Sequence, residues 1–155
     1  MTFLIVLAVL LAAAFSISYL IRSSLLISLP TAVFGITAVL YIFGIFNLLL
    51  VGFWLVLAGI ALATAVSFAL LVRDKELLKQ LKSLLSPGLA IFVSLALFSF
   101  LITRGMQLSS WDEFSHWGTI VKATFLFDAV GPYSPVELGF RSYPPSLSLF
   151  EYFVT

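Results

Sequence analysis

The first 72 residues carry a single charged side chain, Arg22, and this feature limits the possible folds more than any other. The composition of the whole chain agrees, since 62% of its 155 residues are hydrophobic and 10% are charged. A soluble domain cannot bury that much apolar surface. A chain that crosses the hydrocarbon core of a bilayer needs such an apolar surface, and its backbone polar groups must be paired within helices. The sequence therefore predicts an all-α integral membrane protein.

Charge and cysteine content exclude several functions. The formal net charge is +1, so the chain offers no basic field that would attract a nucleic acid. The sequence contains no cysteine, which excludes disulfides, thiolate nucleophiles and cysteine-ligated zinc. Membrane lipids are thus the first partners that the composition predicts.

Four apolar runs have close to the ~20 residues that a membrane-crossing helix needs. Pro30 lies near the start of the second run and predicts a local kink there. Only the weak turn signal of residues 44–47 separates the second run from the third. A further apolar run near the end of the sequence predicts the start of a fifth span. The four predicted spans are residues 3–21, 25–43, 48–72 and 89–103.

Small side chains recur along the third predicted span. Glycine or alanine at such spacing allows two membrane helices to approach closely, so the sequence predicts a packing face here. The residues concerned are Gly59, Ala61, Ala63, Ala65 and Ala69.

The segment 73–88 joins the third and fourth spans and has the pattern of an amphipathic helix. Its leucines recur at helical spacing while its lysines face elsewhere, and Pro87-Gly88 is expected to end it. Four basic residues in this short loop favour the cytoplasmic side of the plasma membrane, which makes residues 106–143 extracytoplasmic. The predicted organisation is three membrane helices in 1–72, a cytoplasmic connector in 73–88 and a third region in 89–155.

A polar segment follows the fourth span and contains the only histidine of the chain. Ser110 and Glu113 have the spacing of a capping box, so a helix is predicted from Trp111 to about Phe127. At about 100° per residue, this helix has one polar and one apolar face, as expected for a helix in the membrane interface. The polar face carries Asp112, Ser115, His116, Thr119 and Lys122, and the apolar face Phe114, Trp117, Gly118, Val121 and Phe125.

A specific order of motifs follows residue 89. An acidic pair, Asp112-Glu113, comes after a membrane helix, and a juxtamembrane helix and a Gly/Pro-containing loop come next. The chain then reads Tyr143-Pro144-Pro145-Ser146-Leu147 as it re-enters the membrane. This order resembles the first extracytoplasmic loop of the GT-C membrane glycosyltransferases, such as the protein O-mannosyltransferases and the aminoarabinose transferases of lipid A. Ser146 departs from the Pro-Pro-Leu motif of that family, and FSHWG at 114–118 has no counterpart in a general family motif.

The resemblance implies a transferase that moves a sugar from a polyprenyl-phosphate carrier to a cell-envelope acceptor outside the membrane. The acceptor needs a carboxylate base, and the resemblance assigns that role to Asp112, with Glu113 beside it. Arg141 and Lys122 are the candidates for binding the donor phosphate, and Tyr143 for fixing the point of re-entry. Because such enzymes have many more helices, the sequence is interpreted as an N-terminal part that is inactive alone.

Several of these residues have alternative roles. Glu113 fits a helix cap, and Lys122 can extend toward the lipid headgroups. His116 is expected to donate a hydrogen bond to substrate or a neighbouring loop, and with Asp112 it would also offer two ligands to a divalent metal. Glu151 lies inside an apolar run, where it is either functional or placed at headgroup level.

Two other classes of function remain open. A transporter is disfavoured because the first four predicted spans lack a charge or a broken helix near the bilayer midplane. A non-enzymatic membrane scaffold, whose loop binds a partner through its aromatic side chains, accounts for the same residues without chemistry.

Overall fold

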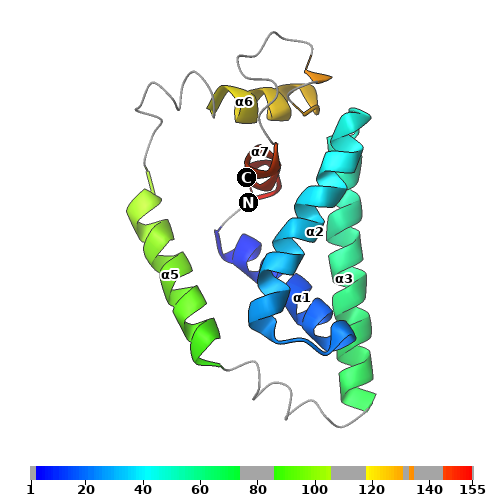
Figure 1. Ribbon diagram of the computed structural model, residues 1–155, viewed down its shortest axis with the longest axis vertical. Helices are drawn as coiled ribbons and strands as arrows, with labels where there is room; N and C mark the ends of the chain where they lie inside the picture. Colours follow the sequence, from blue (N-terminus) through cyan, green and yellow to red (C-terminus); the bar gives the residue numbers. More distant parts are fainter. Residues whose placement is uncertain (1–2, 74–85, 106–117, 131–132, 135–144, 155) are drawn as a thin grey trace. The chain divides into compact units, whose positions relative to one another are not determined.

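The computed structural model describes residues 3–73, 86–105, 118–130, 133–134 and 145–154. Within these ranges the chain forms α-helices joined by turns and contains no β-strand (Figure 1). The predicted all-α class is therefore confirmed. The helices are α1 (Phe3–Ile21), α2 (Leu25–Ile45), α3 (Leu49–Arg73), α5 (Pro87–Thr103), α6 (Gly118–Phe127) and α7 (Ser146–Val154).

Helices α1, α2 and α3 are each long and apolar enough to cross a membrane. Their bounds agree with the first three predicted spans to within two residues. Pro30 lies inside α2, and the helix continues through it to Ile45. Helix α5, with 17 residues, forms where the fourth span is predicted. The long apolar helices are those of a membrane protein, as the composition predicts.

The start of α5 corrects one predicted boundary. Pro87 is the first residue of α5, and the Ser86 side chain accepts a hydrogen bond from the Leu89 N–H at 3.2 Å. Pro87-Gly88 therefore begins this helix, whereas the sequence analysis assigns it to the end of the connector. Proline is favoured at a first helical position because the N–H that it lacks would be unpaired there anyway. The predicted amphipathic helix of the connector falls on residues 74–85, outside the described ranges.

Three helices are followed by a non-glycine residue in the left-handed conformation. The φ angle is 55° at Arg22, 56° at Asn47 and 53° at Asp128. After α1 the turn is closed by a hydrogen bond from the Ser23 N–H to the Ser18 carbonyl at 3.1 Å, as in a Schellman motif. Short polar side chains allow Asn and Asp to adopt this conformation, whereas arginine has no such advantage. The turn at Arg22 therefore carries backbone strain that a glycine would avoid.

Contacts divide the chain into two compact units, and each unit takes part of α2 and part of α3. The N-terminal unit consists of Phe3–Ala32 and Ala58–Met106, and therefore includes α1 and α5. The C-terminal unit includes Val33–Leu57 and Gln107–Thr155, and therefore α6 and α7.

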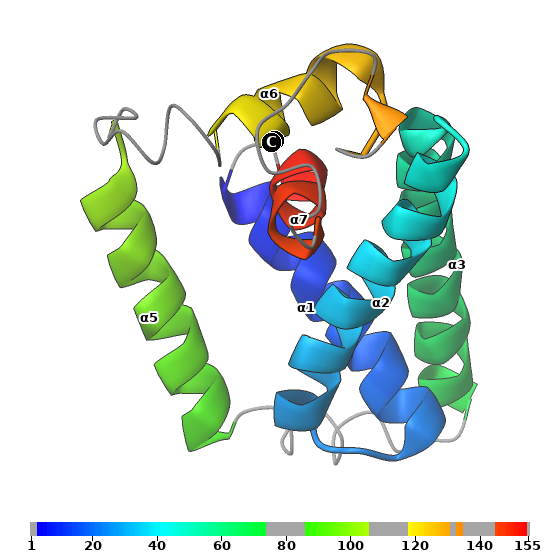
Figure 2. The same ribbon diagram turned by 45° about the horizontal axis from the view of Figure 1, so that its top comes forward.

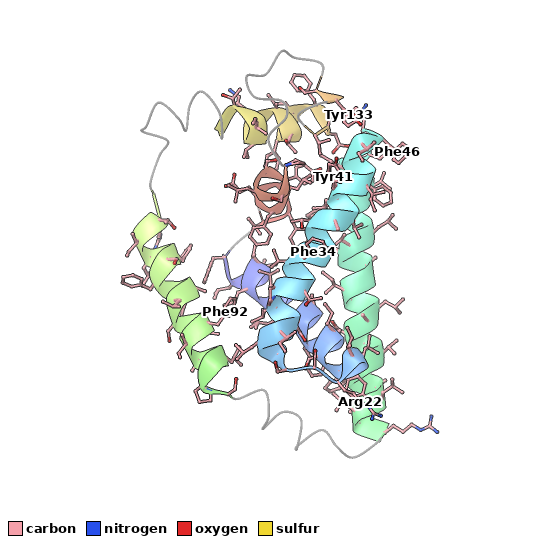
Figure 3. The ribbon with its side chains drawn as sticks, viewed as in Figure 1. Arg22, Phe34, Tyr41, Phe46, Phe92 and Tyr133 are labelled. Atoms are coloured by element: carbon pink, nitrogen blue, oxygen red, sulfur yellow. The ribbon has the colours of Figure 1, made fainter. Side chains whose placement is uncertain are left out.

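The N-terminal unit is held by apolar contacts and one pair of hydroxyl groups. A small core forms from residues of α1 and α2, and Phe92 of α5 packs against it (Figure 3). The Ser16 and Thr64 hydroxyls are 3.0 Å apart and join α1 to α3 by a hydrogen bond. The core consists of Ala14, Leu25 and Leu29, with Leu11 and Leu89 packed around it.

Most residues of the predicted packing face of α3 are exposed within the described chain. In this unit α3 buries Ser67 and Leu71 instead, and a Cβ added at Gly59 would meet no atom within 4 Å. The spacing of small residues marks where a close approach is possible, but it does not determine which face a neighbouring helix covers. The exposed members of the predicted face are Gly59, Ala61, Ala65 and Ala69.

Candidate functional site

Most of the predicted site lies outside the described residues. Lys122 is the one predicted binding residue that is described, and its side chain is exposed on α6. An exposed lysine side chain is compatible with binding a phosphate and with extending toward the lipid headgroups. The predicted residues outside the described ranges are Asp112, Glu113, His116, Arg141 and Tyr143.

The described part of the predicted interfacial helix shows which of its side chains pack within the protein. Helix α6 ends at Phe127, as predicted, and its first predicted turns (111–117) lie outside the described residues. Phe125, which belongs to the face predicted to lie in the membrane interface, is 42% exposed. The side chains buried within the protein belong to neither predicted face. They are Ile120, Ala123 and Thr124.

Helix α6 lies directly on α7, and the face that contacts this neighbour is the face that is buried within the protein. Figures 1 and 2 both show α6 lying crosswise to the parts of α2 and α3 in the same unit.

A polar junction joins the end of α6 to α7 and α3. The Asp128 Oδ1 accepts a hydrogen bond from the Tyr152 hydroxyl at 2.9 Å and another from the Leu50 backbone N–H at 2.8 Å. Leu50 lies in the first turn of α3, which contains no acidic residue of its own. The carboxylate therefore satisfies one of the N–H groups that a helix leaves unpaired at its amino end, and its negative charge is favourable there.

Aromatic rings surround the same junction. The Tyr152 ring lies 4.9 Å from the ring of Phe125 in α6 and 6.4 Å from the ring of Phe53 in α3, centroid to centroid. Phe153 lies 5.7 Å from Phe53 and is completely buried. Helix α7 is thus held to both neighbours by ring contacts, and the Tyr152 hydroxyl finds its partner in Asp128.

The segment after Asp128 approaches α2 closely. A Cβ added at Gly44 would lie 2.6 Å from Val130 Cγ1 and 3.1 Å from Leu49 Cδ2, so only glycine fits this position without a shift. Val130 itself is 1% exposed. Figure 3 shows Tyr133 and Phe46 at the same end of this unit, and both are exposed. Exposed aromatic side chains at one end of membrane helices are typical of the lipid–water interface.

Pro145, the second proline of the predicted motif, forms the amino end of α7. Its carbonyl accepts hydrogen bonds from the Leu149 N–H and the Ser148 hydroxyl, both at 2.9 Å. Glu151 follows on the same helix and is partly buried. Within the described residues no group of three or more His, Cys, Asp or Glu side chains could hold a metal ion. The pair of His116 and Asp112 considered as metal ligands is not among those residues.

The sequence analysis missed Asp128. The one available signal is that α3 begins without an acidic residue in its first turn, so a cap from elsewhere is favourable. That signal does not identify which acid supplies the cap.

Comparison with known proteins gives no relative: no protein-family model, no curated protein and no solved structure matches the chain.

Proposed function

We propose that this protein acts in a membrane glycosyltransferase of the GT-C type, which moves a sugar from a polyprenyl-phosphate carrier to a cell-envelope acceptor. The observation that carries the proposal is the order of Asp112-Glu113, a juxtamembrane helix and Tyr143-Pro144-Pro145 after an apolar helix. Two features support it. Helix α6 follows the acidic pair, and Pro145 opens α7.

In this proposal Asp112 is the base that takes a proton from the acceptor, because a hydroxyl or amine is a poor nucleophile while protonated. Arg141 and Lys122 bind the donor phosphate, whose negative charge grows as the sugar leaves. Tyr143 fixes the re-entry point of the loop. His116 donates a hydrogen bond to the substrate.

The proposed topology places the loop 106–143 outside the cytoplasm. Helix α5 would be the fourth span, extended beyond its described end or matched by local thinning of the bilayer, and α6 would lie in the outer interface. The crosswise direction of α6 and the exposed aromatics Phe46 and Tyr133 support this arrangement.

The experiment that tests this function measures sugar transfer from a lipid-linked donor in membranes that contain the intact protein. Asp112→Asn is expected to lower the rate ~10²–10⁴-fold, since it removes the proton acceptor. Glu113→Gln is the matched control. It sits about 100° around the helix and serves as a cap, so its loss is expected to weaken transfer only modestly.

The outcomes separate the candidate functions. Loss of transfer in Glu113→Gln with normal transfer in Asp112→Asn would shift the proposed register by one residue. Normal transfer in both variants would overturn the enzymatic role of the loop and favour a membrane scaffold.

Topology is tested separately with a cysteine at Tyr133, which is 49% exposed. Because the chain has no native cysteine, this thiol is the single target for a membrane-impermeant maleimide in intact cells. Labelling is expected at this position. Protection at Tyr133 together with labelling of a cysteine at Ser83 would contradict the extracytoplasmic assignment.

A further inference from the structure

We propose that the turn after α1 binds anionic phospholipids, with the Arg22 guanidinium on the headgroup phosphate and Arg73 as a second positive charge nearby. Both arginines belong to the N-terminal unit. This lipid site does not depend on the proposed glycosyltransferase activity.

The N-terminal unit carries a positive charge. The charged side chains among its described residues are Arg22, Arg73 and Arg104, and these described residues include no aspartate or glutamate. All of the three arginine side chains are exposed. No acidic side chain of the described part therefore neutralises this charge, and an anionic partner is attracted to it.

Arg22 and Arg73 lie at the same end of this unit. The Ser16 and Thr64 hydroxyls are 3.0 Å apart, and beyond this contact α1 and α3 run on to the same end (Figures 1 and 2). At 1.5 Å per residue, Arg22 stands about 9 Å and Arg73 about 14 Å beyond the contact along the helices. The two positive charges are therefore at similar depth in a membrane.

The surface around Arg22 fits a lipid better than a free anion. Apolar side chains on either side of it are exposed: Leu20 is 58% exposed, Ile21 67% and Ile27 63%. In a membrane such side chains contact acyl chains, while an arginine at a helix end reaches the headgroup level. A phospholipid contacts both surfaces at once, because its phosphate and acyl chains belong to one molecule. A free phosphate contacts only the arginine.

The backbone holds Arg22 in a fixed position. Its φ angle of 55° is the left-handed conformation that glycine adopts without strain. The Ser18 hydroxyl donates to the Ser23 carbonyl at 2.6 Å, and the Ser23 and Ser28 hydroxyls are 2.8 Å apart, so side-chain bonds keep this turn in shape. A guanidinium presented from a fixed turn loses less freedom on binding, and it offers a phosphate two parallel hydrogen bonds.

The test is thermal unfolding of the purified chain in a neutral maltoside detergent. Short-chain phosphatidylglycerol, phosphatidylcholine or inorganic phosphate is added in increasing amounts. Phosphatidylglycerol is expected to raise the unfolding temperature until the site is saturated, because a ligand that binds only the folded state stabilises it. Phosphatidylcholine, which has no net charge, and inorganic phosphate, which has no acyl chains, are expected to leave it unchanged.

Arg22→Gly separates the charge of this residue from its backbone strain. Glycine relieves the strain, so without lipid the variant is expected to unfold about 2–4 °C above the parent protein. Its apparent affinity for phosphatidylglycerol is expected to fall about five-fold, the factor that corresponds to one arginine at a membrane surface. Damage to the fold cannot explain a variant that is more stable and yet binds the lipid more weakly.

Two control variants match this substitution. Asn47→Gly makes the same change at an uncharged residue with a φ of 56°, and is expected to raise the unfolding temperature without altering lipid affinity. Arg104→Gln removes the exposed arginine that follows α5. Helix α5 begins near the turn after α1, since a Cβ added at Gly88 would lie 2.6 Å from Leu26 Cδ1. Arg104 therefore stands at the opposite end, and its loss is expected to leave lipid affinity unchanged.

Arg73→Gln is the second binding variant and leaves the turn after α1 intact. It is expected to weaken phosphatidylglycerol binding about five-fold without a gain in stability. Unchanged lipid affinity in both Arg22→Gly and Arg73→Gln would overturn the site. Equal weakening by Arg104→Gln would overturn it as well, because the lipid would then respond to net charge alone. An equal stabilisation by inorganic phosphate would show that the ligand is not a lipid.

Discussion

The three long helices and the two short ones of the C-terminal unit depend on different sources of stability. Helices α1, α2 and α3 are apolar along their whole length, so a bilayer stabilises each of them without a specific neighbour. The described parts of α6 and α7 are instead held by specific contacts: they pack on each other, on Phe53 and around Asp128.

This difference determines where a substitution has an effect. In the long helices only a minority of the side chains is buried, so a conservative apolar change alters little at most positions. In α7 nearly half of the residues are buried, so a substitution there more often removes a packing contact. The three predictions that follow test this contrast, from the largest expected effect to the smallest.

The largest effect is expected for Leu149→Ala in α7. Leu149 is 1% exposed, and a Leu→Ala change at a buried site costs about 2–5 kcal/mol. The aromatic cluster of the C-terminal unit is expected to lose its near-UV circular dichroism at a lower temperature than in the parent protein. Leu126→Ala in α6 is the matched control, since Leu126 is 65% exposed. Equal destabilisation by both variants would show that α7 is not packed as described.

Intermediate effects are expected when two glycines of α2 are replaced by alanine, and the free energy of unfolding is expected to change in opposite directions at the two positions. Gly44→Ala places a Cβ against Val130 and Leu49 and is expected to lower the free energy of unfolding by about 1–3 kcal/mol. Gly35→Ala meets no atom within 4 Å and is expected to raise it by about 0.5–1 kcal/mol, because alanine favours the helix. Thermal unfolding in detergent measures both changes. The same sign for both would contradict the close approach of Val130 to α2.

The smallest effect is expected for the hydroxyl pair of the N-terminal unit. Hydrogen bonds between membrane helices contribute about 0.6 kcal/mol on average, so Ser16→Ala and Thr64→Val are expected to be mild. A double-mutant cycle measures the coupling between the two side chains. A coupling energy as large as the Leu149→Ala effect would mean that the long helices also depend on specific contacts.

The bounds of α1, α2 and α3 follow from the sequence because Arg22, the turn signal of residues 44–47 and the charged segment from Arg73 interrupt the apolar runs. The sequence pattern also predicts the end of α6 at Phe127, but not the face that α7 covers. That face depends on α7, and no periodicity within α6 contains this information. The small residues of α3 are a similar case: Ala61 and Ala65 are exposed within the described chain although their spacing permits close packing.

The candidate site likewise has one part that is predicted from the sequence and another part that only the folded structure reveals. Asp112, Glu113, His116, Arg141 and Tyr143 stay predictions from sequence, since they lie outside the described residues. The contact of Asp128 with Tyr152 and the Leu50 N–H could not be predicted, because its members come from three separate helices or their ends and share no motif. Only the folded C-terminal unit brings them together.

The cap on α3 has a consequence for biosynthesis. Asp128 follows Leu50 by 78 residues, so a ribosome has already produced α1, α2 and all of α3 before the acid that caps α3 exists. Until then the amino end of α3 has no acidic residue in its first turn, and water has to solvate its free N–H groups. Helix α3 is therefore synthesised before the residue that caps its amino end, and this cap forms only after the last third of the chain has emerged.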